Sequence, residues 1–200
     1  LQPIHTAVGI ERINVATYQA MSGAGRSAME ALTEQTRAQL AGAPAAANGG
    51  EKSVAFNAVP KISELMDTGY TMEEMKMVWE TRKIFEDPDI MVNPTCVRIP
   101  VYFGHSEAVH IETRTKITVP EVQALLNSSP GIVLLDGHEP GAYPTALTDA
   151  AHRDEVYVGR IREDLSHPRG LDLWVVADNV RKGAALNSVQ IAEILVNQVM

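Results

Sequence analysis

The chain has 200 residues, of which 45% are hydrophobic and 21% charged, the composition of a globular protein long enough to bury its own core. Its 17 Lys and Arg against 25 Asp and Glu give a net charge of −8, which argues against nucleic acid or an anionic membrane as the general partner. The single cysteine, Cys96, excludes an internal disulfide and a cysteine-rich zinc site.

The chain opens with the last turns of a helix, and a strand follows them. Leu1 to Gly9 carries apolar residues at helical spacing and stops at a glycine, like the last turns of a helix that begins upstream. Because the chain also starts with Leu rather than Met, we expect a piece of a longer protein, with a processed but complete protein as the alternative. The β-forming residues from Ile10 to Tyr18 then predict a strand that ends at Gln19.

A glycine-rich turn follows this strand and leads into a helix. The run from Gly23 to Ala28 matches the dinucleotide-binding fingerprint, but a low-complexity loop, Ala41 to Gly50, follows the helix where a second parallel strand is required. We therefore reject a nucleotide-binding βαβ unit here. Two interpretations stay open, a tight turn that needs glycine for backbone reasons and an anion or polar-ligand site at a helix N-terminus. The helical spacing involves Met29, Leu32, Thr36 and Leu40.

A capping box, Thr71 to Glu74, predicts a helix that runs to about Phe85. Its buried stripe is expected to contain Met75, Val78 and Trp79. Glu73 and Lys76 lie three residues apart on another face, where they form either an exposed ion pair or part of a site.

The stretch from Asn93 to Ser106 carries two chemically useful side chains. Arg98 suits a carboxylate or phosphate, and His105 suits proton transfer near neutral pH. Prolines and a glycine are expected to interrupt regular strand pairing here. Cys96 lies in the same stretch with no helix N-terminus to stabilise a thiolate, so packing in the core is a better interpretation than a nucleophile.

The rest of the chain predicts further strands and two helices. Residues 107–117 alternate apolar with polar side chains, as in a strand with one face in water. Remaining elements are a short helix opened by the capping box at 118–121, strands at 132–135, 156–162 and 171–176, and a last helix with an apolar stripe. The total predicts an α+β domain on a mixed, largely antiparallel sheet with helices packed on one face. The histidines lack close ligand spacing, so no metal site is expected.

Several ordered blocks together resemble one family. They are Thr17 to Gly25, Glu73 to Lys76, Cys96 to Val101, His105 to Glu107 and Asp178 to Ala185. They are similar to the C-terminal catalytic and dimerisation domain of aspartate-semialdehyde dehydrogenases. The resemblance implies that residues 1–200 form one substrate-binding and dimerisation domain of the glyceraldehyde-3-phosphate dehydrogenase-like type. It also implies that residues 178–200 provide a C-terminal helix that packs on a separate NADP-binding domain.

The resemblance further implies an activity and the residues that carry it. Enzymes of this family are cytoplasmic homodimers that convert L-aspartate 4-semialdehyde, phosphate and NADP to aspartyl phosphate and NADPH in lysine, methionine and threonine biosynthesis. By this resemblance His105 acts as acid/base and Gln19 orients the substrate. Arg98 binds the substrate carboxylate, Glu73 its amino group and Lys76 the phosphate. Ser22 and Gly23 lie against the nicotinamide of NADP, and Asn179 binds its carboxamide.

The sequence departs from the family pattern in one large respect. The family's nucleophilic cysteine, in an Asn-Cys-Ser/Thr motif, and its glycine-rich NADP-binding fold are both missing from these 200 residues. We therefore expect this chain alone to be inactive. Alternatives are a cysteine-less paralogue, a dimerisation module without catalysis, or an N-acetylglutamyl-phosphate reductase. The Gln19 to Gly25 block and the pair of Glu73 and Lys76 argue against the reductase.

Overall fold

The computed structural model of the protein describes residues 1–45 and 52–199, without the side chain of residue 199, so half of the predicted loop at 41–50 lies outside the described residues. The helices are α1 (Gln2–Val8), α2 (Arg26–Leu40), α3 (Met72–Phe85), α4 (Val119–Asn127) and α5 (Leu186–Val199), with the short turns η1 (Met21–Ala24), η2 (Ala146–Ala150) and η3 (Arg181–Ala185). The strands are β1 (Ile10–Gln19), β2 (Met91–Arg98), β3 (His105–Thr113), β4 (Ile132–Leu134), β5 (Val156–Glu163) and β6 (Gly170–Ala177).

Within the described residues the strands form a single six-stranded sheet in the order β2-β1-β3-β6-β5-β4. The pairs β1/β2 and β4/β5 are parallel, and the three central pairs are antiparallel. The predicted α+β class, with a mixed and largely antiparallel sheet, is confirmed.

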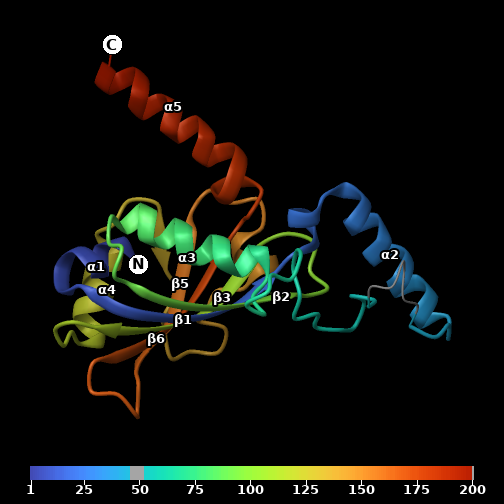
Figure 1. Ribbon diagram of the computed structural model, residues 1–200, viewed down its shortest axis with the longest axis horizontal. Coiled ribbons are helices and arrows are strands. Elements are labelled where there is room, and N and C mark those ends of the chain that lie inside the picture. The colour runs from blue at the N-terminus through green and yellow to red at the C-terminus, as the bar shows by residue number, and fades with distance from the viewer. Residues whose placement is uncertain (46–51, 200) are drawn as a thin grey trace.

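The core lies between one face of this sheet and helices α1, α3 and α4 (Figure 1). Alternate residues of a strand point to opposite faces, so the inward positions of β1 and β3 are mainly apolar there, except for the paired Thr17 and Glu107. The apolar positions include Ile13 and Val15 on β1, which pair with Ile111 and Val109 on β3. Ile4 of α1 packs into the same cluster, so the first helix is part of this domain.

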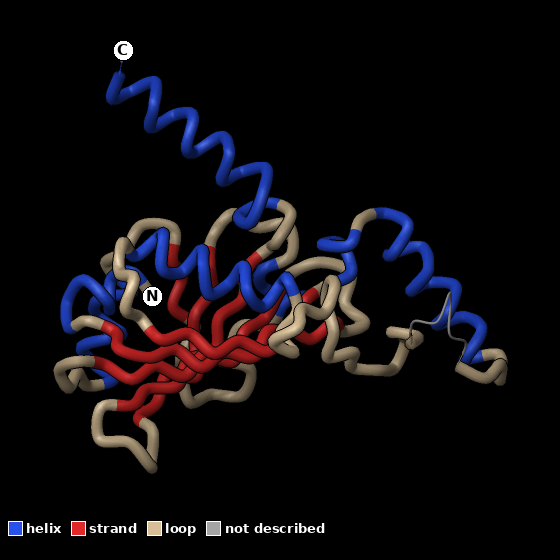
Figure 2. The backbone as a smooth tube through the Cα atoms, viewed as in Figure 1, coloured by secondary structure: helices blue, strands red, loops and turns tan. Residues whose placement is uncertain are grey.

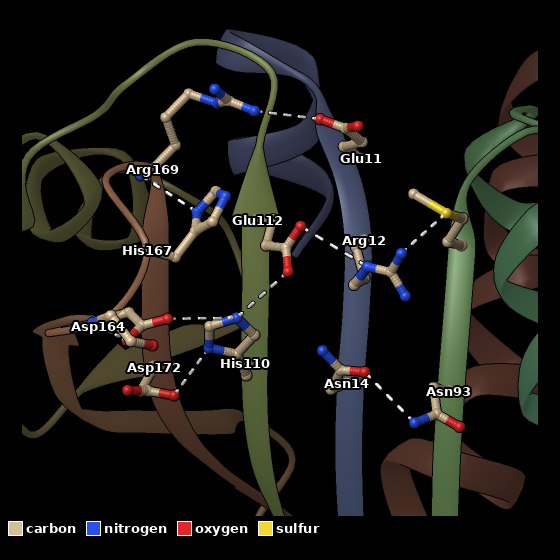
Figure 3. Close-up of polar contacts among 12 residues, drawn as sticks. Glu11, Arg12, Asn14, Asn93, His110, Glu112, Asp164, His167, Arg169 and Asp172 are labelled. Atoms are coloured by element: carbon tan, nitrogen blue, oxygen red, sulfur yellow. Dashed lines mark hydrogen bonds and ion pairs between the residues drawn. The ribbon is translucent and has the colours of Figure 1, made fainter.

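One end of the opposite face of the sheet carries polar side chains (Figure 3), and η2 packs on Val176 at the other end. His110 on β3 lies at the centre of an ionic cluster, 3.1 Å from Asp172, 3.7 Å from Asp164 and 4.0 Å from Glu112. Arg12 on β1 pairs with Glu112 at 3.6 Å. The predicted wet face of the third strand is therefore confirmed.

Both predicted capping boxes form. Thr71 accepts a hydrogen bond from the backbone N–H of Glu74 at 3.2 Å, and the Glu74 carboxylate accepts one from the backbone N–H of Thr71 at 2.7 Å. The Glu121 carboxylate accepts from the backbone N–H of Thr118 at 2.8 Å. These bonds satisfy N–H groups that a helix N-terminus leaves unpaired, so the sequence sets where α3 and α4 begin.

The buried stripe predicted for α3 is partly wrong. Trp79 on α3 is 47% exposed, although Val78 is buried as expected, because α3 faces the sheet with Glu74, Met77 and Val78. On α2 only the central Leu32 is buried. That helix extends away from the sheet, and so does α5 (Figure 2).

The stretch from Asn93 to Arg98 is more regular than predicted. It belongs to β2, which runs parallel to β1 in continuous register from Met91 to Arg98. Pro94 is tolerated because β2 is an edge strand, where one side of the backbone has no neighbour to receive an N–H.

Helix α5 leaves an apolar surface uncovered. Its Val189, Ile191, Ile194, Leu195 and Val196 are each more than half exposed. The predicted helix is confirmed. Its packing on a separate NADP-binding domain stays a prediction, as does the assignment of the whole chain to one domain.

Candidate functional site

The site lies at one end of the sheet, where β1 and β2 end and the antiparallel strand β3 begins. Gln19 is the last residue of β1, and its in-register partner on β2 is Arg98. His105 begins β3 on the other side of β1. The sheet order therefore places Arg98 and His105 on either side of the segment that follows Gln19.

Backbone hydrogen bonds hold the loop at 99–104 against the glycine turn at 20–25. The N–H of Ile99 donates to the carbonyl of Gln19 at 3.1 Å, that of Met21 to Val101 at 2.7 Å, and that of Ser22 to Tyr102 at 3.0 Å. These bonds fix the two loops to each other. The side chains that flank the loop, at 98 and 105, consequently face the turn.

His105 is held in one tautomer. Its Nδ1 accepts a hydrogen bond from the backbone N–H of Ala20 at 3.0 Å, so the proton of the neutral ring is on Nε2. Burial lowers the pKa of His105 to about 4, with a further lowering by the positive charge of Arg98 and a partial offset by Asp178. The expected titration near neutral pH is therefore not found in this chain, where the imidazole is neutral at physiological pH.

The guanidinium of Arg98 is oriented by the backbone of Ala20. Its Nη1 donates to the carbonyl of Ala20 at 2.6 Å, and burial lowers the pKa of the guanidinium while the carboxylate of Glu73 opposes this shift. A methyl group at Gly23 would lie 3.4 Å from both Arg98 Nη1 and His105 Nε2. Arg98 and His105 thus both lie against the bare backbone of Gly23, and the ligand interpretation of the glycine turn stays a prediction.

Glu73 connects α3 to the end of β1. Its carboxylate accepts a long hydrogen bond from Gln19 Nε2 at 3.5 Å and lies 3.5 Å from Lys76 Nζ. The Lys76 side chain is 53% exposed, so this ion pair by itself contributes little to stability. Glu73 thus faces the site, and Lys76 lies at its margin.

Asn179 joins three separate segments at the site. Its Oδ1 accepts from the hydroxyl of Ser22 at 3.0 Å and from the backbone N–H of Gly104 at 3.1 Å. Oδ1 accepts both of these hydrogen bonds, and within the described residues Nδ2 donates to no protein group, so it is available to a ligand. A donor next to Ser22 and the bare backbone of Gly23 suits an amide such as a nicotinamide carboxamide, so these residues fit the expected cofactor end.

Sequence reasoning missed two carboxylates that position these groups. Asp178 is 1% exposed and accepts from the backbone N–H groups of His152, Val180 and Arg181 at 2.7, 2.8 and 3.0 Å. It thereby holds the segment that carries Asn179. The sequence could have pointed to Asp178, because it directly precedes Asn179 in the block from Asp178 to Ala185 that resembles the family.

Glu74 is the second missed carboxylate. Besides closing the capping box, its Oε1 accepts from the backbone N–H of Cys96 at 3.0 Å. This bond fixes α3, which carries Glu73, to β2, which carries Arg98. The capping box was visible in the sequence, but the bond to Cys96 depends on tertiary packing.

Cys96 is a packing residue, as expected. It is fully buried, and burial raises the pKa of its thiol to about 11. Its Sγ lies 3.6 Å from the sulfur of Met77. A thiol in this state is a poor nucleophile.

Metal-binding clusters and membrane-spanning helices are both absent from the described residues. No group of three or more His, Cys, Asp or Glu side chains is placed to hold a metal ion there. No helix within the same residues is long and apolar enough to cross a membrane.

Comparison with known proteins now identifies the family. The family model described as "Semialdehyde dehydrogenase, dimerisation domain" matches residues 1–182. The chain belongs to this family. The resemblance drawn from the ordered sequence blocks is therefore confirmed, and the fold is that of the family's dimerisation domain.

Similar proteins carry the name aspartate-semialdehyde dehydrogenase. The chain is 58% identical over 196 residues to aspartate-semialdehyde dehydrogenase 2 of Vibrio cholerae, a match covering 98% of this chain and 57% of that protein. It is 57% identical over 195 residues to the enzyme of Legionella pneumophila, covering 98% and 56%. The chain thus spans less than three fifths of the length of these relatives.

Solved structures agree with this assignment. The crystal structure of aspartate semialdehyde dehydrogenase II from Vibrio cholerae complexed with ASA matches with a TM-score of 0.94 and 56% identity, covering 99% of this chain and 58% of that one. The aspartate semialdehyde dehydrogenase of Candida albicans with NADP matches with a TM-score of 0.68 and 28% identity, covering 96% and 52%.

Proposed function

We propose that this chain is the substrate-binding and dimerisation part of an NADP-dependent aspartate-semialdehyde dehydrogenase. In the whole enzyme, an NADP-binding domain and a nucleophilic cysteine come from the part of the relatives that this chain does not match. The observation that carries the proposal is the meeting of Arg98, His105 and Glu73 around a turn whose Gly23 presents a bare backbone.

Arg98 is proposed to bind the substrate α-carboxylate. One of its nitrogens is held by the Ala20 carbonyl, which leaves other N–H donors of the planar guanidinium for a carboxylate fork. Glu73, already close to this positive charge, is proposed to bind the substrate amino group. Two opposite charges at fixed positions suit an α-amino acid, and Gln19 next to Glu73 is proposed to orient its carbonyl end.

His105 is proposed as the acid/base residue, which acts on the substrate oxygen through its Nε2–H group. Because Nδ1 accepts from Ala20, the neutral ring presents Nε2–H, which is the atom next to Gly23. The neutral ring keeps this proton, so Nε2–H can hydrogen-bond the oxygen of the aldehyde and stabilise the negative charge that forms there when a thiolate adds, until that oxygen re-forms a carbonyl. Lys76, which is half exposed at the margin of the site, is proposed to bind phosphate.

Ser22, Gly23 and Asn179 are proposed to hold the nicotinamide end of NADP. When bound, NADP supplies the hydride acceptor of the oxidation. The contribution of this chain is the orientation of the ring, through the Asn179 amide that Ser22 and Gly104 fix in place.

The proposed location of the whole enzyme is the cytoplasm.

The chain is also proposed to form a homodimer through the open face of its sheet. The family description names this domain for dimerisation, and the helices α1, α3 and α4 pack on the other face, while only the segment around η2 covers part of this one, at Val176. One end of the face carries ions of both signs, including Arg12 and Asp172, and the other carries aromatic rings, with Tyr18 and Trp174 5.5 Å apart. Such a face is suited to self-association, since each sign can meet the other across a two-fold axis.

A complementation assay tests the activity. The complete gene that encodes these residues is expressed in a bacterium that lacks aspartate-semialdehyde dehydrogenase, and growth is measured without lysine, threonine and methionine. We expect growth with the complete gene, no growth with its Arg98→Ala variant, and no NADPH formation by the purified 200-residue chain. Failure of the complete gene to restore growth overturns the assignment, and a preference for N-acetylglutamyl phosphate in the purified protein replaces it with the related reductase. Turnover by the 200-residue chain would falsify the assignment of the nucleophile to another segment.

A further inference from the structure

A second feature of the Arg98 region has no role in the proposed chemistry. A pocket of about 670 Å³ opens beside Arg98, between the start of α2 and the segment at 52–64. Its lining includes Met21, Ala28, Lys52, Lys61, Glu64 and Arg98. None of the roles assigned through the family resemblance uses Lys52 or Lys61.

The walls of this pocket are anchored on two sides. Val59 and Arg98 exchange two backbone hydrogen bonds of 2.9 Å, which attach the segment at 52–64 to the end of β2. On the other side, Gln35 of α2 accepts from the backbone N–H groups of Val54 and Ala55 at 3.0 and 3.3 Å. The backbone that carries the two lysines is thus held in place relative to Arg98.

The charge of the lining differs in sign from that of the chain. Among the described residues of the lining, Lys52, Lys61 and Arg98 are positive and Glu64 is negative, a surplus of two positive charges in a chain of net charge −8. Both lysines are exposed at the pocket, whereas the guanidinium is partly buried. A concave surface lined by one sign of charge concentrates ions of the opposite sign and raises their rate of association.

We propose that this pocket is the entrance through which anionic substrates reach Arg98, and that Lys52 and Lys61 attract those anions from solution. The inference rests on the proposed function, in which phosphate and a carboxylate-bearing aldehyde both enter the site. The two lysines make no contact with the reacting atoms in this account. They offset the repulsion that an anion meets on approaching a strongly acidic protein.

The test uses the complete enzyme and changes of charge at the pocket. In the double variant Lys52→Gln/Lys61→Gln we expect kcat/KM for aspartate semialdehyde at low ionic strength to fall about three- to tenfold, with kcat unchanged, since only the attraction is removed. The difference is expected to vanish at about 0.5 M salt, where charges are screened within a few ångströms. Glu64→Gln should act in the opposite direction and raise kcat/KM at low salt.

A matched control separates this effect from net charge. Lys83→Gln removes one positive charge from an exposed position near the far end of α3 and is expected to leave kcat/KM and its salt dependence unchanged. If the double variant matches the parent at every salt concentration while the parent is active, the entrance assignment is wrong and the proposed function stands. If the parent enzyme itself does not turn over aspartate semialdehyde, the entrance assignment and the proposed function are both wrong.

Discussion

The backbone N–H of Ala20 donates to Nδ1 of His105 at 3.0 Å and so decides which nitrogen of the ring carries the proton. The sequence shows a histidine but not its tautomer, because the donor lies 85 positions away along the chain. The same Ala20 offers its carbonyl to Arg98 at 2.6 Å. The backbone of one residue after β1 thus orients both chemically important side chains of the site.

The first prediction concerns the titration of His105. In an NMR titration of the ring protons we expect a midpoint of about 4, because burial and Arg98 both disfavour the imidazolium. The unfolded chain takes up this proton near pH 6.5, so the stability contributed by the neutral ring is fully present above that pH and is lost as the pH falls through about 4. His105→Gln assigns the signal, and a midpoint at 6.5 or above contradicts the burial of the ring.

The second prediction concerns Glu74. Glu74→Ala removes one half of the capping box and leaves the buried N–H of Cys96 without a partner, so we expect the free energy of unfolding to fall by about 2 kcal/mol or more. Urea unfolding followed by circular dichroism measures the change. Glu80→Ala, at an exposed position of the same helix, is the control and should change stability by less than about 0.5 kcal/mol. Equal effects of the two variants would show that the bond to Cys96 is dispensable.

The third prediction concerns Gly104, which lies between Arg98 and His105 in the chain. Its φ is +86°, and a Cβ atom there would lie 3.0 Å from Ala146 Cβ and 3.1 Å from the Ala146 carbonyl oxygen. Gly104→Ala is therefore expected to cost about 1–3 kcal/mol and to displace the N–H that holds Asn179. The control is Gly183→Ala, where a Cβ meets nothing within 4 Å and stability should stay the same or rise. A Gly104 variant as stable as the parent contradicts the strain argument.

The fourth prediction concerns the reactivity of Cys96. With a thiol pKa raised to about 11 and no exposed surface, only about one molecule in a thousand is ionised at pH 8. We expect no labelling by iodoacetamide within an hour in the folded chain and rapid labelling in 8 M urea, both measured by mass spectrometry. Fast labelling without denaturant would return Cys96 to the list of candidate nucleophiles.

The fifth prediction concerns the dimer surface. Ala108 lies on the open face of the sheet, paired in register with Trp174, so Ala108→Arg places a bulky charge in the proposed interface. Light scattering should show a dimer for the parent chain and a monomer for this variant. Ala38→Arg on the exposed surface of α2 is the control and should remain dimeric. A folded, dimeric Ala108→Arg variant would move the interface elsewhere, and a parent that stays monomeric at about 100 µM removes the autonomous dimer.

Local patterns were sufficient for the elements and for the family. Capping boxes, glycines and alternating strands act over a few residues, which is why the starts of α3 and α4 and the class of the sheet were predicted correctly. The ordered blocks that identified the family are likewise local, and the family match over residues 1–182 confirms them. The wrong assignment of Trp79 to the core shows the limit, because a helix with apolar residues on more than one side can present either to the sheet.

What the sequence determined by itself is thus the set of secondary-structure elements, the family and the list of candidate residues. What only the tertiary structure decided is their arrangement: the tautomer of His105, the closeness of Glu73 to Gln19, and the binding of Asn179 to both Ser22 and Gly104. The physical reason is distance along the chain. Strand order and loop packing bring together groups separated by up to 157 residues, and no local pattern encodes such a contact.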